Sequence, residues 1–446
     1  MKIYTIYTPL TALILSLLSC GEYLDTKPHS NLVVPESLDD MEQLLDNGTV
    51  FTPYPELLEL QADDFYFEQP YWESMFELVS KNAYIWAKDI YGTTESHSAW
   101  SQPYSRIFYA NAVLDGLQGI ARTQATAARH DHIKGCALFL KAEAVYILAQ
   151  LFAKVYDERT AHSDLGIPIP ISADVNEQVS RPTLEYTFEF ITNSLTEAEK
   201  LLSATVDYSR PSKAAANALL ARVYLYMGRY ENALDHSSAS LQSFDDVIDL
   251  NTATVRDYKN TMLNRFLSPS NDIKNLRAST LIDTVLIRSY SLSDKRLSSF
   301  YLEQSPKKWV KKRFNNLVDL CFTGLDADEQ YLIRSECYAR DGQLDKALED
   351  LNNLLKNRFT VGAYVPYSSS DRDEVLRWIL EERRKELIFR GVRWSDLKRL
   401  NREGFDMKLT RMLGNDVYTL APHDPKWVLP IPLNEVSVTK IIQNER

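Results

Sequence analysis

LLARVYLYMGRYENA, at residues 219–233, has a counterpart further along the chain in IRSECYARDGQLDKA, at residues 333–347. The residues that match at identical spacing are Tyr224, Gly228 and Ala233 in the first stretch and Tyr338, Gly342 and Ala347 in the second. In a pair of packed helices, glycine closes the turn, alanine lets the helices cross closely, and tyrosine covers the joint. Two stretches in the same register indicate an internal repeat.

The spacing resembles that of the tetratricopeptide repeat, a pair of antiparallel helices. Segments 137–152 and 184–202 are also helical by hydrophobic period and length, so that about four such pairs can be assembled. We therefore predict a mainly α protein with a tetratricopeptide-repeat-like scaffold of helical pairs, an irregular, loop-rich second face and little β structure.

Before the scaffold, the chain gives one clear helix signal. Ser37 can cap a helix and form a capping box with Asp40, and Asn47-Gly48 can end that helix. Residues 51–100 follow with many aromatic and turn residues but no clean period. We expect irregular structure there, laid over the helical body.

Between the two repeats, the segment from about 245 to 325 interrupts the helical register. Residues 280–291 carry β-branched side chains in partial alternation, which predicts a strand. The following residues place Phe300, Tyr301 and Trp309 among lysines and arginines.

The amino end, MKIYTIYTPLTALILSLLSC, is typical of a secretory signal. Its apolar stretch is too short, and too interrupted by Pro9, to form a convincing membrane-spanning helix. The segment Leu17-Leu18-Ser19-Cys20 looks like a bacterial lipobox, whose cysteine thiol is acylated and becomes the new N-terminus. The alternative is a plain signal peptide with an incidental cysteine at its cleavage site.

These patterns predict the domain organisation. Residues 1–19 form a signal peptide, and residues 20–36 form a lipidated tether whose several acyl chains suffice for lasting membrane attachment. Residues 37–446 then form one body, with an N-terminal part at about 37–210 and a C-terminal part at about 211–446.

Composition argues against several functional classes. The chain has a formal net charge of −11 and no block of lysine and arginine, so nucleic acid is not an expected partner. Cys136, Cys321 and Cys337 show no metal or disulfide spacing, and Cys136 and Cys337 fall in helical patterns that predict buried thiols. His130 and His132 lack a ligand set, and we expect them in a solvated loop. No metal, cofactor or catalytic nucleophile is predicted.

Six consecutive charged residues, 381–386, lie within a helical pattern, so some of them must face the protein body. Glu381 and Lys385 are available as a local i,i+4 pair. Glu382 and Glu386 could instead be a carboxylate pair for glycoside cleavage, but two acids one turn apart on one helix are poorly placed across a cleft. The run therefore favours a structural ion network over catalysis.

Two segments carry a family resemblance: ILEERRKELIFRGVRWSDLKRL from residue 379 and WVLPIPLNEVSVTKIIQN from residue 427. With the Cys20-Gly-Glu-Tyr-Leu-Asp opening, they look like the SusD/RagB family of outer-membrane nutrient-binding lipoproteins. The residues that fit the family signature are Glu382, Arg384, Glu386, Leu387, Phe389, Gly391, Arg393, Trp394, Asp396, Leu397 and Arg399. Arg390 departs from it, because the family usually has an acidic residue there.

The resemblance implies a nutrient-binding lipoprotein, not an enzyme, that is anchored to the outer membrane through Cys20 and faces the cell exterior. It would bind a glycan, or an oligopeptide instead, and deliver this ligand to a TonB-dependent, SusC-like transporter as its lid. Aromatic rings flanked by polar groups suit such ligands. The candidate contacts are Tyr71, Trp72, Tyr290 and Trp309, which lie in irregular segments, and the alternative for each is a core or interloop anchor.

Two other functions remain open at this point. The helical repeats could form an interaction scaffold that docks a partner protein and holds no small ligand. An enzyme is the third hypothesis, and product release from a polysaccharide or peptide panel would reveal it.

Overall fold

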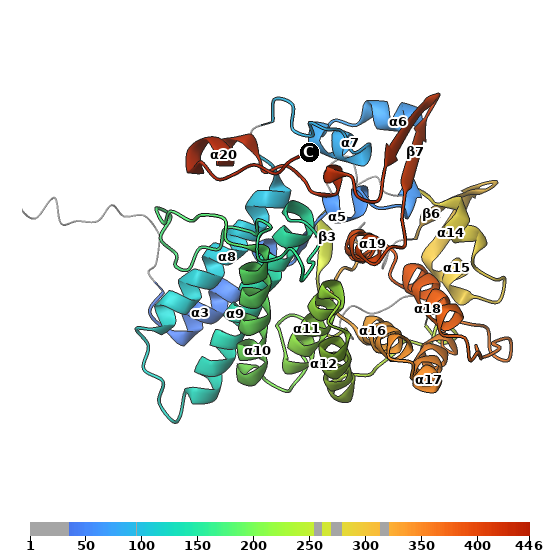
Figure 1. Ribbon diagram of the computed structural model, residues 1–446. Coiled ribbons are helices and arrows are strands. Elements are labelled where there is room, and N and C mark those ends of the chain that lie inside the picture. Colours follow the sequence, from blue (N-terminus) through green and yellow to red (C-terminus); the bar gives the residue numbers. More distant parts are fainter. Residues whose placement is uncertain (1–34, 95, 254–260, 269–278, 313–320) are drawn as a thin grey trace, which may run out of the picture.

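The computed structural model describes residues 35–94, 96–253, 261–268, 279–312 and 321–446. The predicted signal peptide, the lipid-attachment residue Cys20 and nearly all of the tether lie outside these residues. The described chain is mostly helical with little strand, which confirms the predicted fold class (Figure 1).

Long helices pack side by side in chain order and form the body of the molecule. They are α8 (Ser98–Leu117), α9 (Ala127–Phe152), α10 (Leu184–Leu201), α11 (Lys213–Met227), α12 (Tyr230–Ser243), α16 (Ala327–Arg340), α17 (Leu344–Leu355), α18 (Arg372–Glu386) and α19 (Arg393–Arg402). The predicted repeats are the pairs α11–α12 and α16–α17, and α12 packs against α16, so the repeats adjoin.

The two repeat turns are the same. Gly228 and Gly342 both have φ +79°, a left-handed conformation that favours glycine. Arg229 donates its N–H to the carbonyl of Tyr224, and Gln343 donates to that of Tyr338, each at 2.9 Å. This bond, five residues back, closes the helix end in the manner of a Schellman motif. Equal spacing in the sequence thus produces equal turns.

Helix α9 lies within the large hydrophobic core of the protein. Among the described residues it is the one helix long and apolar enough to span a membrane, but 94% of that apolar window is buried inside the protein. His130 and His132 lie on α9, not in a solvated loop, and His130 is buried. The loop prediction was wrong because it ignored the helical segment that starts at Ala127.

Short elements fill the segment between the first helix and α8. The first helix, α3 (Leu38–Leu45), has the expected capping box between Ser37 and Asp40. The short elements that follow are α4 (Gly48–Phe51), β1 (Pro53–Pro55), α5 (Leu57–Leu60), β2 (Phe65–Tyr66), α6 (Gln69–Ser74) and α7 (Leu78–Tyr84). The expected irregular region therefore consists of very short helices and strands.

The insertion between the repeats contributes most of the sheet. Strands β2, β4 (Leu281–Ile282), β6 (Lys308–Lys311) and β5 (Tyr301–Ser305) pair in that order, and β3 (Phe266–Ser268) pairs with β1. The strand predicted at 280–291 is wrong beyond Ile282. Asp283 caps a helix there, α14 (Thr284–Arg288), by accepting from the N–H groups of Val285 and Leu286. Helix α15 (Lys295–Phe300) follows.

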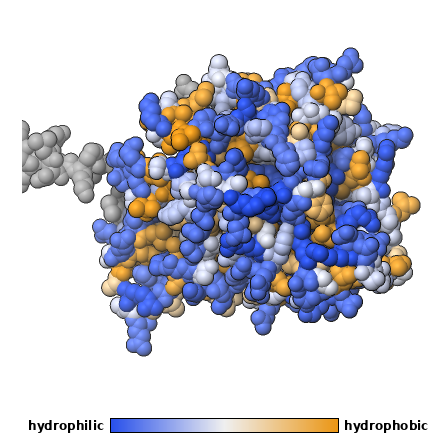
Figure 2. Space-filling model, viewed as in Figure 1, coloured by the Kyte–Doolittle hydropathy of each residue, from blue (hydrophilic) through white to orange (hydrophobic). Residues whose placement is uncertain are grey.

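The carboxyl end crosses back over the molecule. Hairpin β7 (Leu409–Leu413) and β8 (Asp416–Leu420) precedes a 3₁₀ turn, η3 (Pro425–Trp427), and helix α20 (Leu433–Thr439). The proline-rich segment between them is extended as expected, and its Leu429 and Ile431 are fully buried. Figure 2 shows hydrophobic residues interspersed with hydrophilic ones over the face seen in Figure 1.

Candidate functional site

The charged run on α18 faces the protein interior. Glu382, Arg383, Lys385 and Glu386 are buried, and Glu381 is exposed. The expected Glu381–Lys385 pair is absent, since Lys385 binds Glu382 at 2.8 Å and Glu381 binds Arg377 at 3.3 Å. Glu381 lies on the outer face of the helix, so only part of the run could be directed inward.

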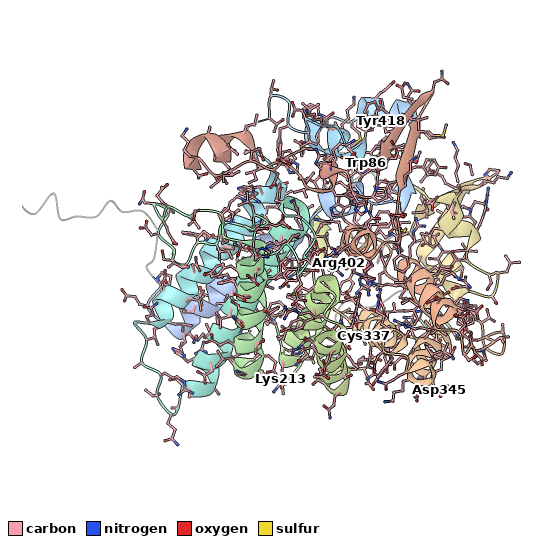
Figure 3. The ribbon with its side chains drawn as sticks, in the orientation of Figure 1. Trp86, Lys213, Cys337, Asp345, Arg402 and Tyr418 are labelled. Carbon is pink, nitrogen blue, oxygen red and sulfur yellow. The ribbon has the colours of Figure 1, made fainter. Side chains whose placement is uncertain are left out.

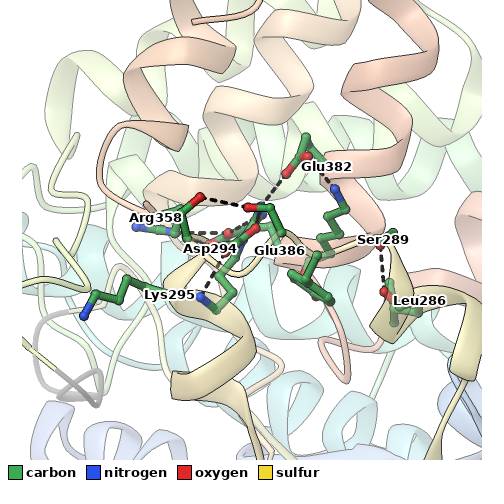
Figure 4. Close-up of polar contacts among 12 residues, drawn as sticks. Leu286, Ser289, Asp294, Lys295, Arg358, Glu382 and Glu386 are labelled. Carbon is green, nitrogen blue, oxygen red and sulfur yellow. Dashed lines mark hydrogen bonds and ion pairs between the residues drawn. The ribbon is translucent and has the colours of Figure 1, made fainter. Parts of the chain in front are cut away.

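Arg296 is the centre of one ion network, and Figure 4 labels its partners Asp294, Glu382 and Glu386. This fully buried guanidinium pairs with Glu382 at 2.5 Å, with Asp294 at 2.7 Å and with Glu386 at 3.2 Å, and Arg358 binds Glu386 at 2.7 Å. Burial alone would raise the pKa of Glu382, but Arg296 and Lys385 bring it below its ordinary value. Two buried carboxylates that share one arginine are not arranged to accept a glycosidic bond.

Further ion pairs attach α19 and the loop before it to distant segments. Arg399 forms a bidentate pair with Glu336 of α16 at 2.6 and 2.8 Å. Arg393 forms another with Asp63, at 2.7 and 2.9 Å. Arg390, the residue that departs from the family pattern, binds Asp328 at 3.0 Å. The signature helices therefore join the second repeat to the segment before α6.

A different region offers half-buried aromatic rings. Figure 1 shows α6, hairpin β7–β8 and strand β6 at the upper right of the molecule, away from α9–α12. We call the four partly exposed rings on these elements the aromatic surface: Tyr71, Trp72, Trp309 and Tyr418.

Trp72 and Tyr71 are fixed in place from beneath. The indole N–H of Trp72 donates to the carbonyl of Lys81 at 3.0 Å, and the Lys81 ammonium lies 4.7 Å from the ring centroid. The Trp72 ring is 6.4 Å from that of Tyr418, at 43°. Tyr71 packs against buried Phe67, with 5.2 Å between ring centroids. Both rings therefore have a fixed orientation and a remaining exposed part.

The hairpin that carries Tyr418 is held by a buried arginine. Arg411 lies 3.7 Å from the ring centroid of Tyr84 and 4.5 Å from that of Trp86, and it donates to the carbonyl of Leu60 at 2.7 Å. Burial lowers the pKa of Arg411 to about 10, so it remains charged at neutral pH. Figure 3 shows Tyr418 near Trp86 at this end of the molecule.

Trp309 lies on strand β6, close to the start of α6. Its neighbour Lys308 forms an ion pair with Glu68 at 2.5 Å, which brings β6 next to the start of α6. Successive side chains of a strand point to opposite faces, so Trp309 lies on the face that carries Lys311. Trp309 is half-buried and is paired across the hairpin with Glu303.

Tyr290 has a different setting from the other candidates. Its side chain is 7% exposed, its hydroxyl donates to the carbonyl of Lys385 at 2.9 Å, and it meets the hydroxyl of Tyr301 at 2.9 Å. Burial raises the pKa of Tyr290 well above its usual value. This is the setting of an anchor beside the Arg296 network, the alternative we gave for each candidate.

The sequence offered a signal for Tyr418 that was not used. Gly414-Asn415 separates two stretches with alternating side chains, which is the pattern of a two-residue hairpin. That pattern would have placed Tyr418 on a short exposed strand.

No metal centre emerges in the part of the chain that the structure describes, where no group of three or more His, Cys, Asp or Glu side chains could hold an ion. Cys136 and Cys337 are buried in α9 and α16, as their helical patterns predicted. Burial raises the pKa of the Cys136 thiol to about 12, so it is unreactive at neutral pH.

Two family models match the sequence. Residues 22–225 match a SusD-like family described as "Starch-binding associating with outer membrane", and residues 329–445 match the family described as "SusD family". Together the matches include both the segment of α6 and the signature helices. A search of curated proteins gives no match.

Solved structures share the fold over nearly the whole chain. A putative sugar binding protein from Bacteroides vulgatus ATCC 8482 is 19% identical with a TM-score of 0.73, covering 92% of this chain and 99% of its own. A SusD superfamily protein from Bacteroides thetaiotaomicron VPI-5482 gives the same identity and TM-score, covering 92% and 100%. A laminarin binding SusD-like protein is 17% identical with a TM-score of 0.65, covering 91% and 97%.

Proposed function

Because this chain belongs to the SusD/RagB family, we propose that it is a cell-surface lipoprotein that binds a glycan at the aromatic surface. Three further parts complete the proposal: a lipid anchor at Cys20, an outer-membrane location facing the exterior, and delivery of the glycan to a TonB-dependent, SusC-like transporter. We propose no catalytic activity.

The observation that carries the ligand proposal is the group of fixed, half-exposed rings at one end of the molecule. An aromatic face stacks on the apolar face of a sugar ring, while polar groups around it bind hydroxyls. Lys81 supplies such a group next to Trp72, and the Glu68–Lys308 pair supplies others at the start of α6. Sugar-binding names among the structural neighbours point in the same direction.

Calorimetry on purified protein tests the ligand proposal. Laminarin, named for one neighbour, is the first probe, followed by starch oligosaccharides and then oligopeptides. We expect Trp72→Ala to weaken glycan binding about tenfold, equivalent to about 1.4 kcal/mol. Trp378→Ala is the matched control, because Trp378 is also half-buried but lies on α18, where its ring packs against Tyr367 with 4.7 Å between centroids.

The outcomes separate the competing functions. Binding of oligopeptides in place of glycans, lost in Trp72→Ala, would favour a peptide-binding relative. Equal glycan affinity in both tryptophan variants would show that the aromatic surface does not bind the ligand. Product release during incubation with a polysaccharide panel would contradict a purely binding role.

The anchor and the transporter need separate tests. A fatty-acid probe should label the wild type and not Cys20→Ala, and that variant should leave the membrane fraction. Purification of the lipoprotein from envelopes should co-purify a barrel transporter. An unlabelled wild type would contradict the lipid anchor without affecting the glycan proposal.

A further inference from the structure

A cavity lies apart from the aromatic surface. It has a volume of about 700 Å³ and is formed by loop 154–165, the second half of α19, loop 422–428 and the last residues 442–445. Ligand pockets usually have volumes of about 300 to 1,000 Å³, so one or two sugar-sized units would fit. No residue of the aromatic surface lines it.

Apolar side chains form much of the wall. They include Val155, Leu165, Val428 and Trp427, whose ring stacks on buried Trp394 with 4.4 Å between centroids. Because Trp394 fixes the Trp427 ring, the wall is rigid at this point. Such a wall suits the carbon skeleton of a compact ligand.

The charges at the outer part of the cavity largely neutralise one another. Lys154 pairs with Asp164 at 2.7 Å, and Arg159 pairs with Asp157 at 2.6 Å. Asp424 binds Lys426 at 3.3 Å, and Glu445 is exposed to solvent. Since these groups are paired or hydrated, they do not determine the charge of the floor.

The floor carries a buried cation without an acidic partner. Lys398 is 3% exposed, and its ammonium donates to the carbonyls of Gln150 at 2.9 Å and Ala153 at 2.7 Å. No carboxylate among the described residues forms an ion pair with it, and burial lowers the pKa of Lys398 to about 7. In its protonated form the amine has three N–H donors, one more than these two carbonyls accept.

Arg402, the other cation of the floor, has protein partners, including a carboxylate. It donates to the carbonyls of Tyr156 at 2.7 Å and Tyr226 at 2.8 Å, and it pairs with Glu403 at 3.2 Å. Glu403 also binds Arg340 at 2.6 Å, so its charge is shared. Figure 3 shows Arg402 at the centre of the molecule. Of the two floor residues, only the protonated form of Lys398 therefore carries a charge that no paired carboxylate in the described part of the chain balances.

A structural role explains only part of this arrangement. Gln150 and Ala153 lie at the carboxyl end of α9, where a cation complements the helix dipole. The dipole contributes about half an elementary negative charge. The two carbonyls accept two of the three N–H donors of a protonated lysine. A ligand carboxylate would supply the remaining charge and the third acceptor.

We propose that this cavity binds a small carboxylate ligand, with Lys398 as its ionic partner and Trp427 against its carbon skeleton. An acidic sugar and a peptide C-terminus both have this chemistry. The site is separate from the aromatic surface, and the proposal does not depend on glycan binding there.

Calorimetry with four probes tests the ligand chemistry. Digalacturonate and acetyl-dialanine carry the carboxylate, while galactobiose and acetyl-dialanine amide are their neutral counterparts. We expect one or both acids to bind about tenfold more tightly than their neutral counterparts. Binding of digalacturonate would identify an acidic sugar as the ligand, and binding of acetyl-dialanine would identify a peptide C-terminus. Absence of binding by both acids up to ~10 mM would overturn the proposal.

Variants locate the binding. Lys398→Met should weaken acid binding at least about tenfold, and Lys398→Arg should retain it. Because Lys398→Met also leaves two carbonyls of α9 without a donor, Thr160→Trp provides a second test. Thr160 is an exposed residue of the wall, so the indole should fill the cavity and prevent binding without loss of thermal stability.

Thr205→Trp is the matched control, since Thr205 is equally exposed but lies outside the cavity. Unchanged acid binding in both Lys398→Met and Thr160→Trp would overturn the proposal. Glycan binding that survives in Thr160→Trp while acid binding is lost would confirm two independent sites.

Discussion

The first helices of the two repeats, α11 and α16, have the same turn but different interiors. Helix α11 buries alanines along its length, including Ala214, Ala218 and Ala221. Helix α16 buries Glu329 and Glu336, both 0% exposed. Repeat spacing thus determines the backbone, whereas the neighbouring helices determine the chemistry of the contact.

The neighbours explain the difference. Helix α11 packs against α10 and α12, whose facing side chains are largely apolar or small, and close approach favours alanine. Helix α16 packs against α18, which with the following α19 supplies buried arginines. Burial of these arginines requires carboxylates opposite them. The second repeat should therefore depend on charge more than the first, in which α11 buries one charged side chain, Arg222.

Glu329→Gln should have the largest effect, because Glu329 is the charged link between the repeats. Its carboxylate forms a bidentate pair with Arg222 of α11 at 2.5 and 2.8 Å. Loss of that charge leaves a buried guanidinium unpaired and should cost about 3 to 5 kcal/mol of unfolding free energy. Urea denaturation followed by circular dichroism measures this.

The double variant Arg222→Met with Glu329→Met sharpens the test. Removal of both charges leaves no buried ion unpaired, so the double variant should be more stable than Glu329→Gln. A loss below about 1 kcal/mol in Glu329→Gln would show that this pair contributes no more than an exposed one.

Acid should weaken the second repeat through Glu336. Burial alone would raise the pKa of Glu336, but Arg399 and Arg340 lower it from 4.5 to about 2. A carboxyl group with a lowered folded-state pKa stabilises the fold above its unfolded pKa and loses that contribution as pH falls. The loss should develop between pH 4.5 and 2 and reach about 3 kcal/mol.

The measurement compares urea unfolding of the wild type and Glu336→Gln at several pH values. The variant should be less stable at pH 7 because the two arginines lose their negatively charged partner. Its unfolding free energy should, however, fall less steeply below pH 4.5. Parallel pH profiles in the two proteins would contradict the assigned pKa.

The matched turn glycines give a smaller and more selective test. Alanine at either position must adopt a left-handed φ, which costs about 1 to 2 kcal/mol. A Cβ at Gly342 would meet nothing within 4 Å, whereas one at Gly228 would lie 2.9 Å from an Arg402 Nη. Gly228→Ala should therefore cost more than Gly342→Ala, and thermal unfolding of the pair measures the difference. Equal losses would mean that Arg402 adjusts freely.

Much of this fold was predictable because its signals are local. The capping box at Ser37 and the turn glycines act within a few residues, so spacing alone reveals them. The strand predicted at 280–291 was wrong because a second local signal was overlooked. Its β-branched residues suggested a strand, but the Asp283 side chain caps a helix that starts at Thr284.

The candidate site was less predictable because its contacts are long-range. The sequence selected Tyr71 and Trp72 by their irregular surroundings, but it could not show that Tyr418, far along the chain, lies beside Trp72. It likewise placed Tyr290 with them, although the Lys385 carbonyl holds that hydroxyl in the interior. Ion-pair partners such as Arg296 and Glu382 are set by tertiary packing, which no residue spacing encodes.

The smallest expected effect comes from an ion pair at the surface of the first repeat. Glu199 binds Lys213, labelled in Figure 3, at 3.0 Å where both side chains contact water. Glu199→Gln should change the unfolding free energy by less than about 0.5 kcal/mol, because water already solvates the lysine left behind. Measured beside Glu329→Gln under the same conditions, it makes the same chemical change in an exposed Glu–Lys pair instead of a buried Glu–Arg pair. A comparable loss in both variants would mean that the second repeat gains nothing special from its buried charges, and the contrast between α11 and α16 would then be one of composition alone.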